Sequence, residues 1–237
     1  MQDEVFLKPA AKGGFRFNKE VADVFDDMVT RSVPMYPEIT RLCARFAADA
    51  AIEGTRVYDL GCSTASTLLE VNKYRGNKKL ELVGCDPSPD MLAKAKDKVA
   101  AYDNFILKQE NAQQADLSDA SVVIMNFTLQ FIPREERPAI LKKIADALPK
   151  GGLFVFSEKI ATDLPDELDG LVTKLYDEYK QFNGYADSEI ANKRKALENV
   201  LVPDSHTWHK KALGEAGFAG SAIIANWLNF SCMMAWK

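Results

Sequence analysis

The sequence predicts an α/β fold, a mostly parallel seven-stranded sheet with helices on both faces. Short apolar runs rich in β-branched residues alternate with helical patterns through the middle of the chain, as is typical of parallel sheets. Glycine and proline clusters separate these runs, and two more strand-like runs close the chain. The predicted strands cover residues 56–60, 80–85, 105–108, 121–125, 153–157, 220–225 and 228–235.

Helices are predicted where apolar residues recur with the helical period beside a start or stop signal. Ser88-Pro89-Asp90 is a start, because serine caps a first turn and proline suits its geometry. Pro149-Lys150-Gly151-Gly152 is a stop directly before a strand. The predicted helices cover residues 19–31, 36–49, 133–148, 165–182, 188–200 and 205–216, with one more that starts at residue 88.

The order of these elements indicates one domain over residues 1–237. A chain of this length can bury one sizeable core, and the sequence contains no repeat, low-complexity tract or flexible linker. We expect N-terminal helices over 1–55, a cofactor-binding core over 56–160, a helical cap over 161–218 and a terminal strand pair over 219–237.

Composition argues against several classes of function. The net charge is −4, from 30 Lys and Arg against 34 Asp and Glu, so we expect no direct nucleic-acid binding. No apolar run could span a bilayer, and the N-terminus lacks signal-peptide features, so we expect no membrane association. Cys43, Cys62, Cys85 and Cys232 lack metal-site spacing, which predicts reduced thiols, no metal and a cytoplasmic location.

The most specific local signal is Val57-Tyr58-Asp59-Leu60-Gly61-Cys62-Ser63, followed by a second strand that ends in Asp86. A glycine turn lets backbone N–H groups approach a ligand, and the acid can accept hydrogen bonds from ribose hydroxyls. The dinucleotide fingerprint would need glycines at Ser63 and Ser66. S-adenosylmethionine (SAM) is therefore favoured over NAD, and a strand–turn–helix without any ligand is the third interpretation. The terminal strand pair is also typical of SAM-dependent methyltransferases.

Ligands of open α/β sheets bind beyond the carboxyl ends of the strands. The candidate cofactor residues at those ends are Gly61, Cys62, Ser63, Asp86, Pro87, Asn111, Ala112 and Asn126. Asn126 closes an apolar strand, so it is either a cofactor contact or a cap for the next turn. Asn111 has the same two interpretations, because asparagine also serves turns. Cys62 is interpreted as a small packing residue within the turn.

Three further candidates, Arg31, Tyr36 and Arg194, lie outside the predicted core in or near loop signals. Arginine binds carboxylates through two N–H groups at once. An arginine near the SAM sulfonium would therefore indicate an anionic substrate. His206 and His209 are the only histidines. They stand three residues apart without a third ligand candidate nearby, so we interpret them as surface or structural residues.

Several segments together resemble the carboxy-S-adenosyl-L-methionine synthase family. The matching segments are Arg31-Ser32-Val33-Pro34 with Tyr36, residues 57–63, Asn126-Phe127-Thr128-Leu129-Gln130-Phe131, Ser157-Glu158-Lys159 and the stretch 183–200. The resemblance covers nearly the whole chain from about Phe17. The glycine turn alone is weak evidence, because many methyltransferases have it. The other segments occurring in one chain are much more specific.

The resemblance implies a Rossmann-like class I SAM methyltransferase fold and a defined reaction, in which SAM and prephenate give carboxy-SAM and phenylpyruvate. Prephenate loses CO₂, the SAM methyl group loses a proton, and the ylide captures the CO₂ in a pocket that must exclude water. By this resemblance Arg194 binds the new carboxylate, Tyr36 and Arg31 complete the catalytic set, and Tyr36, Gly61, Cys62, Ser63, Asp86 and Asn126 contact the cofactor.

The resemblance also implies a homodimer and a functional partner, a tRNA carboxymethyltransferase that uses the product on wobble uridine. Apolar residues near the C-terminus exceed the needs of a solvent-facing strand pair, although core positions account for at least half of them. These residues are Trp227, Leu228, Phe230, Met233, Met234 and Trp236.

The chain departs from the family pattern at three cofactor positions. Ala65 stands where glycine is usual, Pro87 where asparagine is usual, and Asn111 replaces an acid. Two alternatives stay open. One is a conventional SAM-dependent methyltransferase acting on a small molecule or tRNA, and the other is a protein that binds a SAM-like ligand without catalysis.

Overall fold

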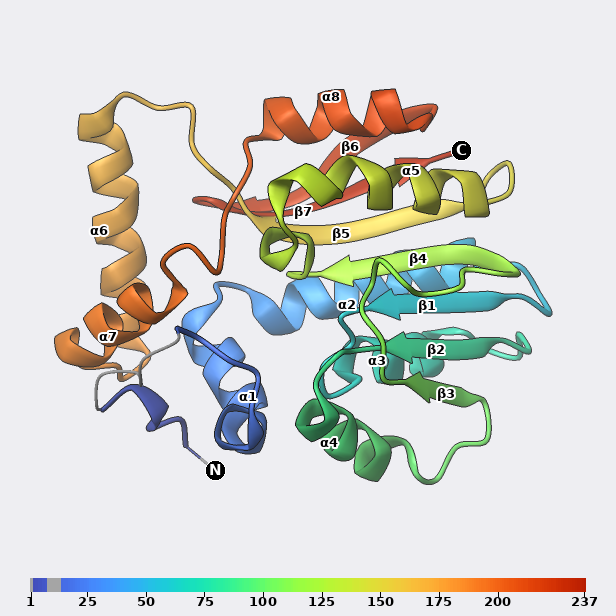
Figure 1. Ribbon diagram of the computed structural model, residues 1–237, viewed down its shortest axis with the longest axis horizontal. Helices are drawn as coiled ribbons and strands as arrows, with labels where there is room; N and C mark the ends of the chain where they lie inside the picture. Colours follow the sequence, from blue (N-terminus) through green and yellow to red (C-terminus); the bar gives the residue numbers. More distant parts are fainter. Residues whose placement is uncertain (1, 8–13) are drawn as a thin grey trace.

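The computed structural model describes residues 2–7 and 14–237 and is built on one seven-stranded sheet (Figure 1). The strands are β1 (Arg56–Leu60), β2 (Glu81–Cys85), β3 (Phe105–Lys108), β4 (Ala120–Asn126), β5 (Leu153–Lys159), β6 (Gly220–Trp227) and β7 (Phe230–Trp236). Their order in the sheet is β3-β2-β1-β4-β5-β7-β6. Only β7 runs antiparallel to its neighbours β5 and β6 among these strands. The predicted α/β fold and terminal strand pair are confirmed.

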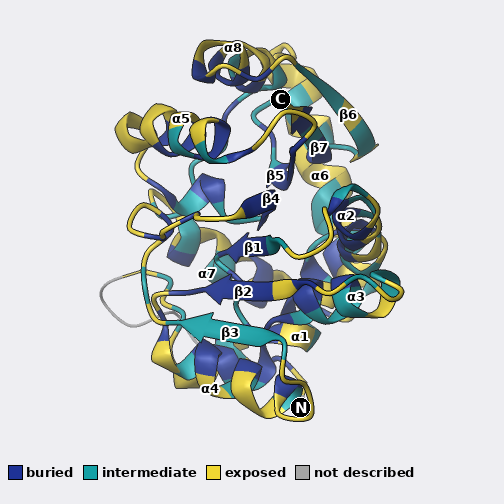
Figure 2. Cartoon of the chain, turned by 90° about the vertical axis from the view of Figure 1, so that its right-hand side faces the viewer, coloured by how far each residue is buried: buried dark blue, intermediate teal, exposed yellow. Residues whose placement is uncertain are grey.

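Helices cover both faces of the sheet, as Figure 2 shows in end view. The helices are α1 (Lys19–Ser32), α2 (Tyr36–Ala50), α3 (Ser66–Tyr74), α4 (Pro89–Val99), α5 (Arg137–Ala147), α6 (Asp166–Phe182), α7 (Asp187–Leu197) and α8 (His206–Ala216). Apolar residues of α2 and α3 bury one face of the central strands, and those of α5 and α8 bury the other. Burial of these apolar stripes is the main source of stability in such a layered fold.

Helix α4 packs beside β3, and the other three helices lie at one end of the sheet. Helices α1, α6 and α7 gather beyond the carboxyl ends of the parallel strands (Figure 1). This is the end at which open α/β sheets bind ligands, so α6 and α7 of the predicted cap stand over the predicted site. The third helix predicted within that cap, α8, instead packs with α5 on a face of the sheet, where its apolar residues join the core. Within the described residues, no helix is both long and apolar enough to cross a membrane.

Element boundaries agree with the sequence except at a few ends. The helix predicted over 133–148 begins at Arg137, after a short 3-10 turn over Arg134–Glu136. Proline at position 138 explains this, because it has no N–H to donate to the carbonyl of residue 134. Strand β5 continues to Lys159, two residues past the predicted end, where its pairing with Phe230 of β7 extends the ladder.

A buried arginine holds the loop that follows β4. The Arg137 guanidinium donates to the carbonyl oxygens of Ile132 (2.9 Å), Gln130 (3.1 Å) and Val202 (2.8 Å), and it pairs with Asp204. Charge-assisted hydrogen bonds of this kind are among the strongest in proteins. The loop over residues 127–132 is therefore rigidly held, and it flanks the site described next.

Candidate functional site

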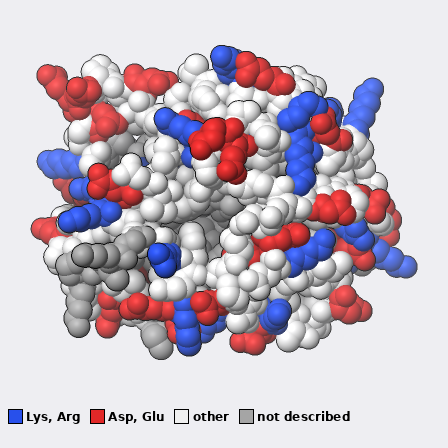
Figure 3. All heavy atoms as spheres, in the orientation of Figure 1, with Lys and Arg blue, Asp and Glu red and all other residues white. Residues whose placement is uncertain are grey.

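A cavity of about 940 Å³ lies between the strand ends and the cap. The surface in Figure 3 is hollowed near the middle of the face shown, and acidic and basic side chains are interspersed around it. All of the predicted cofactor residues line this one cavity: Tyr36, Gly61, Cys62, Ser63, Asp86, Pro87, Asn111, Ala112, Asn126 and Arg194. The sequence therefore identified residues that the fold brings together.

The glycine turn after β1 is tightly constrained. Gly61 has φ +80°, and a Cβ there would collide with the side chain of Thr128. Ser63 and Ala65 also adopt left-handed backbone conformations, with φ 51° and 61°. The Ser63 N–H donates to Asp86 Oδ2 at 2.9 Å, so the acid at the end of β2 also holds the turn. Several strained residues in one loop are typical of functional sites.

Two buried acceptors at the ends of neighbouring strands lack hydrogen-bond partners among the described residues. These atoms are Asp59 Oδ1 of β1 and Asn126 Oδ1 of β4, and both residues line the cavity. Burial, helped by the charge of Asp86, raises the pKa of Asp59 to about 8. A buried acceptor without a partner is costly, so this end of the cavity calls for a donor such as a ligand ammonium or hydroxyl group.

The surroundings of two predicted cofactor residues bear on their interpretation: Asn126, a cofactor contact or a cap, and Cys62, a small packing residue. The Asn126 side-chain amide donates to Thr40 (3.3 Å) and Thr67 (3.4 Å), while its oxygen is left for a ligand. The Cys62 side chain packs so closely on β2 that a Cβ at Gly84 would stand 2.8 Å from its sulfur. Cys62 is therefore a packing residue whose position also borders the cavity.

A row of aromatic side chains crosses the cavity wall from the sheet to the cap. Tyr36 stacks on Phe127 (6.0 Å between centroids), Phe127 meets Phe230 (6.3 Å), and Phe230 meets Tyr176 of α6 (4.9 Å). All four residues line the cavity. Burial raises the pKa of the Tyr36 phenol, which keeps it neutral. Because Phe230 is inclined by 61° to Phe127 and by 54° to Tyr176, the row offers both ring faces and ring edges to a ring of similar size.

Cations line the cap end of the same cavity. Lys159, Lys180, Lys193 and Arg194 face it, and Asp177 pairs with Lys180 (2.8 Å) and with Arg194. Both hydrogen bonds recorded for the Arg194 guanidinium use Nη2, one of them at 2.6 Å. Since a guanidinium carries five N–H donors, Arg194 has donors left for a ligand carboxylate.

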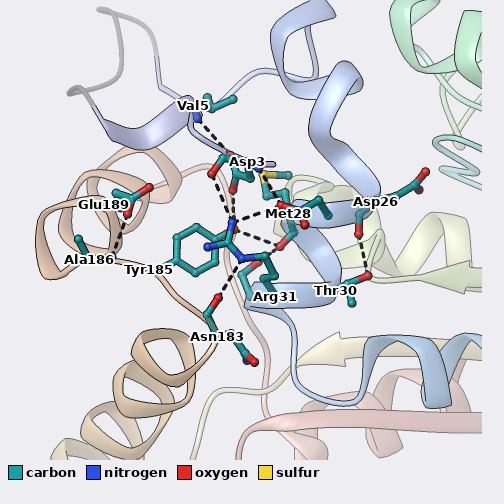
Figure 4. Close-up of polar contacts among 12 residues, drawn as sticks. Asp3, Val5, Asp26, Met28, Thr30, Arg31, Asn183, Tyr185, Ala186 and Glu189 are labelled. Carbon is teal, nitrogen blue, oxygen red and sulfur yellow. Dashed lines mark hydrogen bonds and ion pairs between the residues drawn. The ribbon is translucent and has the colours of Figure 1, made fainter. Parts of the chain in front are cut away.

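Arg31 differs in position from the other predicted catalytic residues, because it is not among the residues that line the cavity. Figure 4 shows it between Tyr185 and Asn183, and its Nε donates to the Asn183 carbonyl at 2.9 Å. Its Nη1 donates to Asp27 at 3.2 Å, and its guanidinium stacks 4.2 Å above the Tyr185 ring. The structure thus has Arg31 tying α1 to the loop that leads into α7.

The two histidines lie away from the cavity. His209 is buried against the rings of Phe156 and Trp208, and burial lowers its pKa to about 4. His206 contacts Ser231 at 3.0 Å. Their interpretation as structural residues is confirmed. Among residues 2–7 and 14–237, no group of three or more His, Cys, Asp or Glu side chains is arranged to hold a metal ion.

Sequence reasoning missed several cavity residues. Asp59 and Lys159 are polar residues near strand ends and line the cavity, so the rule that selected Asn126 could have found them. Lys180 and Lys193 gave no such signal, because they lie on the helices of the cap. Of the three family departures, Pro87 and Asn111 line the cavity, whereas Ala65 is buried beside it in the left-handed conformation that normally favours glycine.

Comparisons with known proteins agree with this picture. A family model described as a methyltransferase domain matches residues 58–154. The carboxy-S-adenosyl-L-methionine synthases of Campylobacter fetus and Campylobacter concisus are 41% and 42% identical to the chain, and 100% of each chain is covered. The synthase of Sulfurimonas denitrificans is 41% identical, again over 100% of both chains.

Solved structures support the fold. An O-methyltransferase family protein from Burkholderia thailandensis superposes with a TM-score of 0.62 at 17% identity, covering 93% of this chain and 60% of that one. Human N-acetylserotonin methyltransferase in complex with SAM has a TM-score of 0.59 at 14% identity, covering 92% and 55%. At such identities the likeness concerns the fold, which is that of class I SAM methyltransferases.

Proposed function

The chain belongs to the carboxy-S-adenosyl-L-methionine synthase family, and from that premise we propose that it converts SAM and prephenate to carboxy-SAM and phenylpyruvate. The reaction balances when water is released. Prephenate gives up CO₂ and its ring hydroxyl as the ring becomes aromatic, the SAM methyl group gives up a proton to that hydroxide, and the methyl carbon bonds to the CO₂. The product would serve as carboxymethyl donor for the 5-oxyacetyl modification of wobble uridine in tRNA.

The observation that carries this proposal is the polarity of the cavity. Asp59, Asp86 and Asn126 supply acceptors at the strand ends, whereas lysines and Arg194 supply positive charge at the cap. SAM carries an ammonium and a sulfonium, and prephenate carries two carboxylates. The two ends therefore complement the two reactants, and the aromatic row between them suits the prephenate ring.

Each predicted site residue has a role that fits its position. The strand-end residues would hold SAM, with Asp86 and the turn over 61–63 at its ribose and methionine parts. Tyr36, which stacks on Phe127, would cover the bound cofactor. Arg194 would bind the carboxylate that forms on the former methyl group. Arg31 would act as a positioning residue, because it supports the loop that precedes α7.

Closure against water follows from the same architecture. Aromatic residues and buried apolar side chains line much of the cavity, and the cap covers the end at which the strands finish. A carbanion next to a sulfonium would be quenched by a water molecule, so a dry site is required for CO₂ capture.

The proposed homodimer has support from a surface that the sequence analysis did not identify. Helix α6 exposes a row of apolar side chains, Leu168, Leu171, Leu175 and Phe182, the last of them 91% exposed. At the C-terminus, in contrast, Phe230 and Met233 are buried. Exposed apolar rows of this kind mark association surfaces, and we propose that a second copy of the chain covers α6.

A direct assay tests the proposed function. The purified protein, in a cytoplasm-like reducing buffer, would be incubated with SAM and prephenate, and the products would be identified by mass spectrometry. We expect a SAM species heavier by one CO₂ together with phenylpyruvate, and neither product when prephenate is omitted. S-adenosylhomocysteine formed with an added acceptor, and no carboxylated SAM, would replace the proposal with a conventional methyltransferase.

A further inference from the structure

Lys159 is a cation that the described fold leaves without a counter-ion. It closes β5, directly beyond the buried residues Ser157 and Glu158, and its side chain lines the cavity. Within residues 2–7 and 14–237, no hydrogen bond or ion pair is formed by its ammonium. Lys159 is half-buried, and a cation that is partly withdrawn from water without an anion beside it is costly. This arrangement therefore calls for an anionic ligand.

The backbone of Lys159 is firmly positioned. Its N–H donates to Gln130 Oε1 at 2.9 Å, and Gln130 belongs to the loop that Arg137 holds. Its partner across the ladder is Phe230. The backbone that carries this cation is therefore fixed at the strand end, so only the lysine side chain has to be ordered when a ligand binds.

The surroundings of Lys159 are those of an anion site. Its ammonium lies 5.1 Å from the centroid of the Tyr176 ring, and that of Lys180 lies 4.1 Å from the same centroid. Arg194 is near enough to add to the positive charge at Lys159, and Asp177 and Asp169 oppose it. Asp177 is paired with Lys180 and Arg194, however, and Asp169 accepts a hydrogen bond from Thr162.

Tyr176 links this cation pair to the rest of the cavity. Its hydroxyl donates to the Ser32 carbonyl at 2.8 Å, and its ring is the last member of the aromatic row. A ligand whose ring lies along that row would extend toward Tyr176, and an acidic group at the far end of the ligand would meet Lys159.

We propose that Lys159 binds the second carboxylate of a dianionic substrate, the one that is not transferred, while Arg194 binds the carboxylate destined for SAM. This inference rests on the proposed function for the identity of the dianion. Lys159 and Arg194 would thus bind different carboxylates of the same substrate. The side-chain carboxylate of the α-keto acid is retained in phenylpyruvate, whereas the ring carboxylate is lost. Phenylpyruvate therefore reports on the Lys159 subsite alone.

The test compares Lys159→Gln with Lys159→Arg and with Lys211→Gln, an exposed lysine of α8 outside the cavity. Binding of phenylpyruvate to the SAM-loaded protein and the KM for prephenate would be measured for each. We expect Lys159→Gln to weaken both by about 10- to 100-fold, the worth of a charge-assisted hydrogen bond. Lys159→Arg should keep most of the affinity, and Lys211→Gln should match the wild type.

Arg194→Ala supplies the opposite pattern. It should abolish carboxy-SAM formation. The affinity for phenylpyruvate should stay within about threefold of the wild type, because the contact between Lys159 and the retained carboxylate is unchanged. Unchanged phenylpyruvate affinity in Lys159→Gln would overturn the assignment, and so would a parallel loss of SAM affinity, since Lys159 would then support the fold.

The two proposals fail in different ways. A wild-type protein that does not convert prephenate contradicts the proposed function. Phenylpyruvate binding is measured without turnover, so its dependence on Lys159 is decided separately.

Discussion

The two ends of the cavity are built on different principles. At the strand ends, Asp59 and Asp86 are buried and held by the ladder and by backbone N–H groups. At the cap, Arg194 is 55% exposed on a helix that follows a loop, and α6 buries only Lys180 among its residues. The end of the cavity at the strands is therefore rigid. The cap end is supported by few buried contacts and is the more adaptable of the two.

The charges differ as well as the rigidity. Burial raises the pKa of Asp59 to about 8 and also raises the pKa of Asp86. A cation bound beside Asp59 would lower that pKa again, so the strand end gains negative charge when a cation arrives. Burial lowers the pKa of Lys159 and of Lys193 to about 8, so the cap gains positive charge when an anion arrives. Each end would be neutralised by a ligand of opposite charge. One cavity could therefore hold the proposed cation and the proposed dianion together.

The largest expected effect breaks the cap end alone. Arg194→Ala should reduce carboxy-SAM formation by more than about 100-fold, because the carboxylate that forms on the former methyl group would lose the cation that binds it. The affinity for SAM, measured by calorimetry, should stay within about threefold, since the strand end is intact. Normal turnover by this variant would contradict the role assigned to Arg194.

The next largest effect breaks the strand end. Asp59→Asn should weaken SAM binding by about 10- to 100-fold, because the carboxylate that would pair with a charged donor is replaced by a neutral amide. The ligand-free variant should nevertheless be more stable at pH 8, by about 1–3 kcal/mol, because a buried carboxylate is removed. Thermal unfolding with and without SAM separates the two consequences.

The pH dependence of this stability effect has a definite sign. The pKa of Asp59 is raised from 3.8 to about 8 in the fold, so the folded protein binds more protons than the unfolded chain between those values. Its contribution to stability is therefore present at low pH and is lost as pH rises from about 4 to 8. At pH 4, the lower end of that range, Asp59→Asn and the wild type should unfold at nearly the same temperature.

A smaller effect is expected when a rise in pH, instead of a substitution, removes the charge of Lys159. Desolvation, with the charges of Lys180 and Arg194, lowers its pKa to about 8, so the ammonium loses its proton above that pH. The KM for prephenate should then rise by about tenfold between pH 8 and pH 9.5. Lys159→Arg should show no such rise, because a guanidinium stays charged. A flat KM profile for the wild type would weaken the assignment of Lys159.

The smallest expected effect concerns the turn between the two ends. Ala65 has φ 61°, a left-handed conformation that costs an alanine about 1–2 kcal/mol. Ala65→Gly should relieve that strain. The greater flexibility of glycine in the unfolded chain offsets part of the gain, so the unfolding free energy should rise by up to about 1 kcal/mol. Denaturant unfolding measures it, and a loss of stability would show that the Ala65 methyl packing outweighs the strain.

Local signals in the sequence were sufficient for most of the architecture. The apolar periods of residues 105–108 and 153–157 and the cap at Ser88 appear in the structure almost unchanged. The strand-end rule also located Asp86 and Asn126 in one cavity, because the carboxyl ends of parallel strands must meet at one edge of the sheet.

Residues of the cap were harder to interpret. Arg31 belongs to a segment that resembles the family, yet its guanidinium contacts Tyr185 and Asn183 and does not line the cavity. The exposed apolar row on α6 was not recognised, since its residues have the ordinary period of a core-facing helix. Only the packing of α6 beside α1 and α7 decides which of its faces is left open.

The sequence by itself determined the fold class, the glycine turn, the strand-end acceptors and the family, because these depend on local backbone chemistry and on motifs of contiguous residues. The tertiary structure alone decided that Lys159, Lys180 and Tyr176 meet at one end of the aromatic row, and that Arg31 does not join them. Such meetings depend on how helices far apart in the chain pack over a sheet edge, and local periodicity carries no information about that packing.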